Sequence, residues 1–299
     1  MKHIFIINSI SGKGQGPKLL SLIKEISEAQ GLDYLTEMTT HPGHARELAQ
    51  QYSALEDTCL YSVGGDGTLL EVINGIDTDT PLSVIPAGSG NDFYRLIGPD
   101  PSDYRKILSD SLSAEIRRID IGENDRMRFL NTTSFGMDAD VNAYASNLIR
   151  RTMITKGPAY LLGILNNMFI LRPKHVKMKV DEQELEGDYL IVSCMNGRYY
   201  GNGIQAAPES DLQDGYFDLC LLENMPRRRA YPFLAKYLQG KHLGTKGFSV
   251  IRCKKIDFLL SEETSCQSDG ENFIASALSI KIKERFLALK APSYLNIIH

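Results

Sequence analysis

Cysteine is scarce in this sequence, and its few copies are not arranged in pairs. Five cysteines are scattered along 299 residues, and none forms a C-x-x-C pair: Cys59, Cys194, Cys220, Cys253 and Cys266. The pattern excludes a disulfide scaffold and a cysteine-based zinc site. Isolated thiols of this kind are typical of a protein of the reducing cytoplasm.

Long apolar runs are absent as well. No stretch reaches the roughly 18 apolar residues that span a bilayer. The nearest, 159–171, is interrupted by Asn166 and Asn167. The chain starts with Met1-Lys2-His3 and then enters a short apolar stretch, which is not the pattern of a signal peptide. We expect a soluble, cytoplasmic protein that contacts membranes only at its surface.

Nor is there an excess of positive charge. The net charge is −4, with 10 Lys and Arg against 17 Asp and Glu in residues 1–120, and 23 against 20 in residues 121–299. Because nucleic-acid binding relies on neutralising phosphates, this balance argues against a nucleic-acid partner. The mildly basic second part favours contact with an anionic surface.

The pattern of the first 120 residues is an alternation of strands and helices. With 42% hydrophobic and 23% charged residues the chain is an ordinary globular protein, and its length suggests two domains. Periodicity predicts strands over 3–8, 33–39, 58–63 and 82–85, and helices over 17–30, 44–52 and 68–74. This alternation indicates an α/β domain with an open, mostly parallel sheet and helices on both faces.

The pattern changes near residue 121. Most later segments read as strands separated by turns, which indicates an all-β, antiparallel, sandwich-like domain. The predicted strands are 126–134, 176–180, 189–195, 216–222, 248–253, 256–260 and 278–282. Helical stretches interrupt them at 138–150, 158–171 and 231–238.

The stretch Gly64-Gly65-Asp66-Gly67-Thr68 carries the strongest chemical signal. It follows a predicted buried strand and opens a helix, an arrangement whose backbone N–H groups and helix terminus suit a polyphosphate. A carboxylate among phosphate ligands would be repelled unless a divalent cation lay between them. Asp66 therefore indicates a nucleotide and Mg²⁺ site of a phosphoryl-transfer enzyme. The plainer interpretation is a turn that only reverses the chain.

Two further loops are predicted to leave the same edge of the sheet. Residues 8–14, starting with Asn8, follow the first strand, and residues 86–93, with Ser89 and Asn91, follow the fourth. Ligands bind at the carboxyl edge of open α/β sheets, so the three loops together suggest a cradle for ATP. Neither a Walker-type G-x-x-x-x-G-K-[ST] pattern nor a G-x-G-x-x-G spacing occurs.

Taken in order, several motifs resemble one known family over essentially the whole chain. They are Gly64–Thr68, Pro86–Phe93 and Asp269-Gly270-Glu271, joined by Asp214–Asp218 and Lys241-His242-Leu243. The chain resembles the bacterial lipid kinases of the diacylglycerol kinase and sphingosine kinase superfamily. The resemblance implies a nucleotide-binding domain over 1–121, completed by about 291–299. It also implies a β-rich lipid-acceptor domain over 122–290, with the active site between the two.

The resemblance also implies residue roles. Glu271 would be the general base for the lipid hydroxyl, and Asp66 would organise Mg²⁺ and ATP. Together with the glycine loops, this gives a predicted nucleotide set of Asn8, Thr39, Gly64, Gly65, Asp66, Gly67, Thr68, Leu69, Leu70, Glu71, Ser89 and Asn91. A structural Mg²⁺ would be held by Asp211, Asp214 and Tyr216, the outer two through backbone carbonyls. Two positions depart from the family pattern: Leu70 replaces the usual Asn, and Ser89 replaces the usual Thr.

The residues alone leave plainer interpretations open for three of these features. Glu271 would otherwise lie in a solvated acidic turn, and Asp214-Gly215 would be a β-turn. The apolar stretch 160–171 is either core or one wall of an acyl-chain pocket. Basic clusters at 150–151, 174–179 and 227–229 are either solvated faces or a docking surface for an anionic leaflet.

We therefore expect an ATP-dependent kinase that phosphorylates a hydroxyl of a neutral lipid, with diacylglycerol as the first choice and phosphatidic acid as its product. One rival is a kinase with a soluble acceptor such as NAD. Another is a non-catalytic, nucleotide-responsive lipid-binding protein. CTP or GTP as the donor, and assembly into a homodimer, stay open at this stage.

Overall fold

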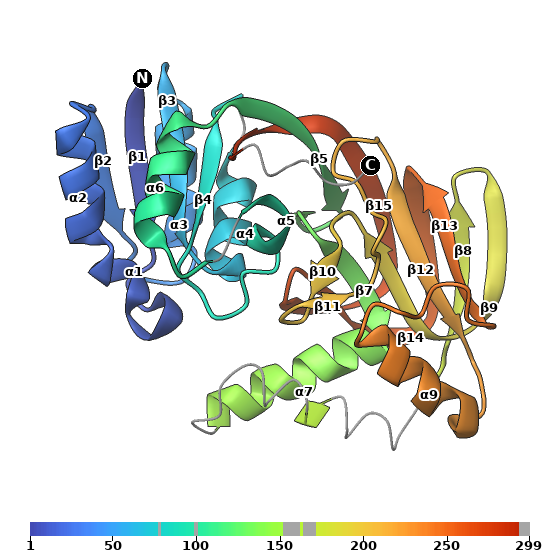
Figure 1. Ribbon diagram of the computed structural model, residues 1–299. Helices are drawn as coiled ribbons and strands as arrows, with labels where there is room; N and C mark the ends of the chain where they lie inside the picture. Colours follow the sequence, from blue (N-terminus) through green and yellow to red (C-terminus); the bar gives the residue numbers. More distant parts are fainter. Residues whose placement is uncertain (77–78, 99–100, 152–161, 164–171, 293–299) are drawn as a thin grey trace. The chain divides into compact units, whose positions relative to one another are not determined.

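The computed structural model describes residues 1–76, 79–98, 101–151, 162–163 and 172–292 (Figure 1). The chain forms two compact units. Unit 1 consists of residues 1–120 and 284–299, and unit 2 of residues 121–283. The sequence had placed these junctions at 121/122 and at about 290/291.

Unit 1 is built on four parallel strands. Strand β1 (Lys2–Ile7) lies between β2 (Tyr34–Met38) and β3 (Thr58–Gly64), and β4 (Leu82–Pro86) pairs with β3. The run Ile4–Ile7 is fully buried, as expected for a β-branched strand covered on both faces. All four strands thus end at one carboxyl edge.

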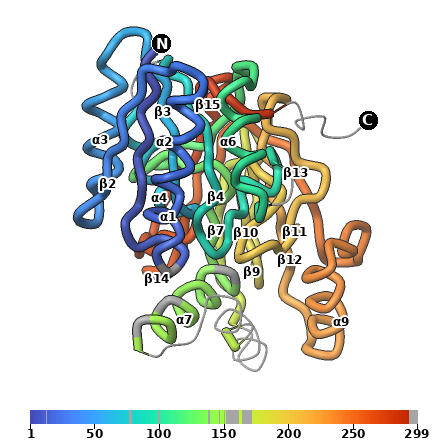
Figure 2. The backbone as a smooth tube through the Cα atoms, turned by 60° about the vertical axis from the view of Figure 1, so that its left-hand side comes forward, coloured from blue at the N-terminus to red at the C-terminus, as the bar shows by residue number. Residues whose placement is uncertain are grey.

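Helices cover both faces of this sheet (Figure 2). Helices α3 (His44–Ser53) and α4 (Asp66–Gly75) pack together on one face, and α2 (Leu20–Ala29) and α6 (Tyr104–Ser113) on the other. A Cβ on Gly75 would lie 2.2 Å from the Arg46 carbonyl oxygen, so glycine is needed where α4 approaches α3. The short helical turns of unit 1 are η1 (Ser11–Lys13), α1 (Gln15–Lys18) and α5 (Tyr94–Ile97).

Unit 2 is rich in antiparallel strands. Its longest are β9 (Gln183–Met195), β14 (Lys255–Ser268) and β15 (Glu271–Lys290), the last of which carries the chain back into unit 1. The others are β5 (Ile116–Asn124), β6 (Arg128–Phe129), β7 (Thr132–Gly136), β8 (Lys174–Val180), β10 (Tyr199–Tyr200), β11 (Ile204–Gln205), β12 (Phe217–Glu223) and β13 (Phe248–Cys253). Strand β7 pairs with β9 and β14, and β12 pairs with β9 and β13.

Two apolar clusters stabilise unit 2. One is enclosed by strands and contains Phe129, Phe135 and Phe217. The other contains residues of α7 (Met137–Arg151) and α9 (Arg227–Tyr237) packed on strand residues. Both helices lie at the same end of unit 2 (Figures 1 and 2). Unit 2 is therefore strand-rich, with two helices contributing to one of its cores.

The single strand predicted over 126–134 is wrong. The chain instead forms β6 and β7 with a break at Leu130–Asn131. The carboxamide of Asn124 and the carboxylate of Asp269 cause the difference. Asn124 accepts the N–H groups of Arg126 and Met127 and makes a turn, while Asp269 accepts the N–H groups at the break. Hydrophobic alternation cannot reveal these long-range partners.

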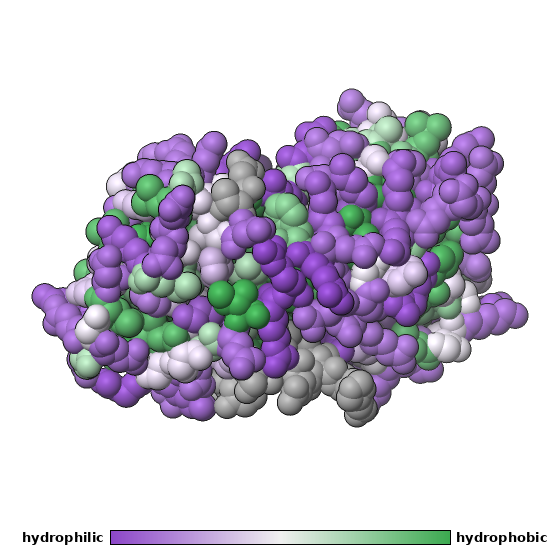
Figure 3. Space-filling model, turned by 90° about the horizontal axis from the view of Figure 1, so that it is seen from above, coloured by the Kyte–Doolittle hydropathy of each residue, from purple (hydrophilic) through white to green (hydrophobic). Residues whose placement is uncertain are grey.

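Within the described ranges, no helix is long and apolar enough to cross a membrane. On the face of the molecule in Figure 3, hydrophobic residues are interspersed with hydrophilic ones. Exposed apolar residues scattered in this way need no special explanation.

Buried His3 in unit 1 gives a testable dependence of stability on pH. Its Nδ1 lies 2.8 Å from the Tyr61 hydroxyl, which is also 3.5 Å from the Lys290 ammonium. Burial, and next the charge of Lys290, lower the pKa of His3. As pH falls below about 6.5, His3 therefore becomes protonated in the unfolded chain before it does in the folded protein. The free energy of unfolding decreases as a result.

We expect the denaturant concentration at the unfolding midpoint to decrease as the pH is lowered from neutral to mildly acidic. In His3→Gln this decrease should be smaller. Some dependence should persist in this variant, because burial also lowers the pKa of His242 in unit 2. Chemical denaturation followed by circular dichroism over this pH range measures the effect. Equal slopes for both proteins would contradict the role of His3.

Candidate active site

Three loops of unit 1 are tied together at the carboxyl edge of the sheet. The side-chain amide of Asn8, after β1, donates to the Thr68 hydroxyl of α4 (2.8 Å). The Ser11 hydroxyl donates to the carbonyl of Ala87 after β4 (2.9 Å), and the Ala87 N–H donates to Gly64 (2.8 Å). The predicted grouping of these loops is thus present within one unit.

Glycine is required where these loops approach one another. A Cβ on Gly88 would lie 2.3 Å from the Cα of Gly65, and one on Gly12 would lie 2.3 Å from the Ala87 carbonyl oxygen. Gly12 also has a positive φ of 55°. The missing side chains let backbone approach backbone here, which forms the kind of cradle that phosphates use.

Asp66 begins α4 within this cradle. One of its carboxylate oxygens accepts the Phe93 N–H (3.3 Å), and the other has no hydrogen-bond partner among the described residues. A half-buried carboxylate with a free oxygen, beside backbone N–H groups, is the donor type that Mg²⁺ prefers. The residues here fit a magnesium ion.

The other residues predicted to bind the nucleotide fall into an exposed group and a buried group. Ser89 and Gly67 are exposed, and Asn91 closes the loop after β4 by a pair of 3.1 Å hydrogen bonds with Gly88. By contrast, the side chains of Leu69 and Leu70 are buried in the core. These two side chains are therefore unavailable to a ligand, and position 70, where the resembled family usually has Asn, is a core leucine here.

Glu71 and Thr39 hold protein elements together. The two carboxylate oxygens of Glu71 accept the N–H groups of Gly43 (3.0 Å) and Ala45 (3.1 Å), at the beginning of α3. The Thr39 hydroxyl accepts the Ser9 N–H (3.3 Å). Glu71 thus caps a helix and positions the loop before it, a function that the sequence pattern did not reveal.

In unit 2, Asp269 and Gly270 form the turn of a β-hairpin. Ser268 at the end of β14 pairs with Glu271 at the start of β15, and the two turn residues have φ of 44° and 93°. Asp-Gly with positive φ at both positions is the type I′ turn of a two-residue hairpin loop. A solvated acidic turn was the plainer interpretation of this stretch, and its Asp-Gly pair is the local signal of the hairpin.

Hydrogen bonds to other strands and to α7 fix this turn. The Asp269 carboxylate accepts three successive N–H groups, those of Leu130 (2.6 Å), Asn131 (3.0 Å) and Thr132 (2.9 Å). The Asn142 side chain of α7 donates to the Gly270 carbonyl (3.0 Å). No sequence pattern pointed to Asn142, because it acts across 128 residues.

The rigid turn presents Glu271 to solvent. Glu271 is exposed at the first position of β15, and its side chain has no hydrogen-bond or ion-pair partner among the described residues. A side chain free of internal partners is available for an external one. Its predicted role as a general base stays a prediction.

The predicted metal set Asp211, Asp214 and Tyr216 lies in one turn before β12. Here Asp214 accepts the Tyr216 N–H (2.9 Å) and pairs with the Arg252 guanidinium, which also lies over the Tyr216 ring. Burial raises the pKa of Asp214 in spite of this partner. Because Arg252 supplies the positive charge, the Asp214 side chain does not fit Mg²⁺ in this arrangement.

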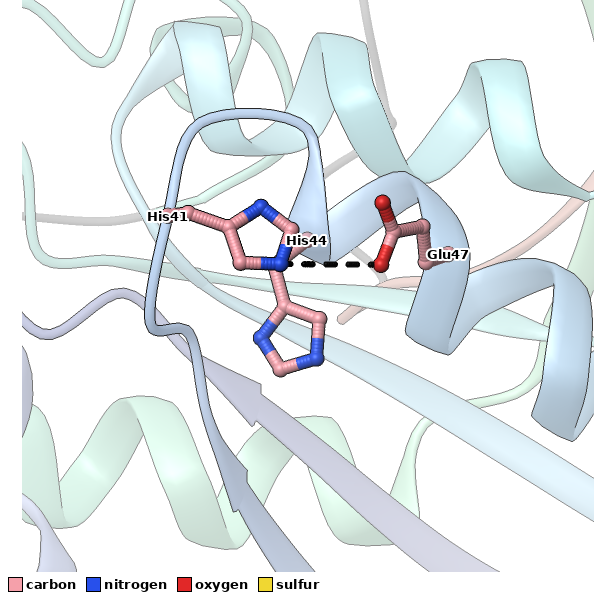
Figure 4. A group of neighbouring side chains, drawn as sticks. All are labelled: His41, His44 and Glu47. Carbon is pink, nitrogen blue, oxygen red and sulfur yellow. Dashed lines mark ion pairs between the residues drawn. The ribbon is translucent and has the colours of Figure 1, made fainter.

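A second group of metal-ligand types lies at the start of α3 (Figure 4). One ligand atom each from His41, His44 and Glu47 lie within 4.8 Å of one another, and the His41 and Glu47 side chains are 3.7 Å apart. However, the Thr40 N–H donates to His44 Nδ1 (3.1 Å). Neutral His44 then carries its proton on Nε2, so neither ring nitrogen is free for a metal. We assign no metal here.

The predicted apolar helix 158–171 lies outside the described residues apart from 162–163, and so do residues 293–299. The acyl-pocket interpretation of 160–171 stays a prediction.

Glycine loops and a carboxylate at the carboxyl edge of a parallel sheet are typical of a nucleotide-dependent phosphotransferase. The family model "Diacylglycerol kinase catalytic domain" matches residues 2–124, and the model "YegS C-terminal NAD kinase beta sandwich-like domain" matches residues 131–291. The chain belongs to the diacylglycerol kinase family of lipid kinases. The predicted family and enzyme class are therefore confirmed.

Relatives extend over nearly the whole chain. A "Diacylglycerol kinase" of Bacillus subtilis is 28% identical over 275 residues, which cover 91% of this chain and 90% of the relative. A "Probable lipid kinase YegS-like" of Pseudomonas fluorescens is 30% identical, covering 90% and 89%. A crystal structure of a diacylglycerol kinase from Bacillus anthracis has a TM-score of 0.80 at 22% identity, with 98% and 97% covered, and shows the common fold.

Proposed function

We propose that this protein transfers the γ-phosphoryl group of ATP to a hydroxyl of a neutral lipid, converting diacylglycerol to phosphatidic acid. The observation that carries the proposal is Asp66, a carboxylate with a free oxygen inside the glycine cradle of unit 1. The name of the Bacillus subtilis relative supports diacylglycerol as the acceptor.

The cradle would bind the nucleotide through its backbone. Backbone N–H groups at the beginning of α4 and in the loop after β4 would bind polyphosphate oxygens, since the glycines there carry no side chains that would keep a phosphate away. Asp66 would hold Mg²⁺, which supplies charge neutralisation on the phosphates when bound. The hydrogen bond from Asn8 to Thr68 joins the loop after β1 to the beginning of α4. Most of the rate enhancement would come from this positioning.

Glu271 would take the proton of the lipid hydroxyl. The hydroxyl oxygen then forms a bond to the γ-phosphorus, the bond from that phosphorus to the β–γ bridging oxygen breaks, and ADP leaves with the electron pair. The fixed hairpin turn favours this role, since it holds Glu271 on a rigid support while leaving its carboxylate free.

Access to the acceptor requires contact with a bilayer surface, because diacylglycerol resides in membranes. We propose peripheral contact by a protein that acts at the cytoplasmic face. ATP as donor is proposed over CTP or GTP on the basis of family membership alone.

An acceptor screen tests the proposal. Purified protein is incubated with Mg²⁺, γ-labelled ATP and either a total lipid extract, diacylglycerol micelles or NAD. We expect label in phosphatidic acid, with NAD unlabelled. Label in NADP would assign a soluble acceptor. Nucleotide and lipid binding without any labelled product would assign a non-catalytic protein and overturn the proposal.

A further inference from the structure

One segment of unit 2 concentrates positive charge. Between Glu223 and Asp257 the chain holds nine Lys and Arg residues and no Asp or Glu, although residues 121–299 as a whole carry 23 against 20. We call residues 224–256 the basic segment. It comprises α9, the loop that follows, β13 and the first two residues of β14.

Most of these charges are not balanced by neighbours. Five exposed residues of the basic segment have no carboxylate within 4 Å anywhere in the described part of the chain: Arg228, Arg229, Lys236, Lys241 and Lys246. Elsewhere in unit 2, Lys174, Lys177 and Lys281 are paired with Glu262, Glu186 and Glu123. These three lysines have carboxylate partners, as do Arg252 and Lys255 at the end of the segment, whereas the five residues above have none among the described residues.

The three arginines at 227–229 occupy positions in α9 that do not stabilise the helix. Helix α9 buries Ala230, Phe233, Leu234 and Tyr237 against the core and begins with three arginines in its first turn. Positive side chains at the beginning of a helix oppose its dipole and reduce its stability. Helix stability therefore does not account for their placement, and an external partner of negative charge would.

Apolar side chains stand among these charges. Leu238 at the end of α9 and Leu243 in the next loop are each 38% exposed, and Lys241 lies between them in sequence. The loop is fixed by His242, which is fully buried and lies 2.9 Å from the Ala206 carbonyl. Because that anchor points inward, Lys241 and Leu243 on either side are held at the surface.

We propose that the basic segment is a docking surface for an anionic membrane, with Arg228, Arg229 and Lys236 contacting phosphate headgroups and Leu243 entering the interface. The inference rests on the proposed function, since a lipid kinase must reach an acceptor in a bilayer. Basic residues interspersed with exposed leucines match the headgroup and acyl boundary of a leaflet. A nucleic-acid backbone would offer no partner for the leucines.

Vesicle binding tests the surface without kinase activity. The full chain is sedimented with vesicles of phosphatidylcholine, or of phosphatidylcholine mixed with phosphatidylglycerol, in the absence of ATP and diacylglycerol. We expect preferential binding to the anionic vesicles that weakens as salt is added. Each basic residue should contribute about fivefold, so Arg228→Gln/Arg229→Gln/Lys236→Gln should bind about 100-fold more weakly.

A matched control removes the same charge elsewhere in unit 2. Lys177→Gln/Lys179→Gln/Lys281→Gln should bind anionic vesicles like the wild type. Thermal unfolding separates docking from a structural role, because removing the first-turn arginines should leave the midpoint unchanged or raise it. Leu243→Ser should weaken binding about threefold, and this loss should persist at high salt, where charge is screened.

Three outcomes would overturn the proposal: equal losses in both triple variants, equal binding to neutral and anionic vesicles, or tighter binding of an RNA oligonucleotide than of anionic vesicles. The last would assign the segment to nucleic acid. The vesicle assay contains neither nucleotide nor acceptor, so a negative result in the acceptor screen does not affect its outcome. Likewise, a failure to bind vesicles does not affect the outcome of the acceptor screen.

Discussion

Asp66→Asn should lower kcat by about 10³-fold or more and leave the fold intact. The substitution keeps an oxygen that can accept the Phe93 N–H, so loop packing is preserved, but it removes the negative charge of the group that would hold Mg²⁺. We also expect Mg²⁺ to lose its effect on nucleotide binding. Initial rates with labelled ATP, and thermal shifts with nucleotide in the presence and absence of Mg²⁺, measure both effects.

Asp57→Asn is the matched control for this change. Asp57 lies just before β3 and Asp66 just after it, so the same substitution is made at the opposite end of one strand. The Asp57 carboxylate pairs with the amino group of Met1. Its kcat should equal that of the wild type. A rate for Asp66→Asn that is close to the control would refute the metal-holding role.

Glu271→Gln should lower kcat by roughly 10²–10⁴-fold, the usual contribution of a general base. Glutamine has nearly the same shape and cannot take the acceptor's proton. Because Glu271 has no internal partner in the described structure, neither ATP binding nor the unfolding midpoint should change. Steady-state kinetics with diacylglycerol micelles and nucleotide thermal shifts separate the chemical step from binding.

Glu263→Gln provides the comparison, since Glu263 is likewise exposed and lies on the neighbouring strand β14. It should show unchanged kcat. Should Glu271→Gln retain more than about a tenth of the wild-type kcat, the base would have to be sought elsewhere.

The family and the nucleotide loops were predictable because their signals are local. Gly65 and Gly88 are required by close backbone approach, and Gly64 leaves room for the Thr68 side chain. Asp66 follows a strand whose hydrophobic run is apparent in the sequence. Strands β1–β4 were found nearly to their ends for the same reason. Burial on both faces demands continuous apolar runs.

The long strands of unit 2 were only partly predictable. Strands β14 and β15 reach 14 and 20 residues, but their polar ends gave no periodic signal. Their outer parts are held by pairing with each other across the Asp269-Gly270 turn and by the N–H groups that Asp269 accepts. Hydrogen bonds between distant segments decide such strands, and hydropathy does not record them.

The amino-acid order by itself determined the kinase family, the strand–loop–helix units of unit 1 and the identity of the carboxylate in its cradle. Only the tertiary structure decided that Glu71 caps α3, that Arg252 pairs with the Asp214 carboxylate, and that five basic residues near α9 have no carboxylate partner among the described residues. Local conformation depends on neighbours in the chain, whereas pairing of charges depends on which segments meet in space. Arg252 and Asp214 are 38 residues apart, and no periodicity connects them.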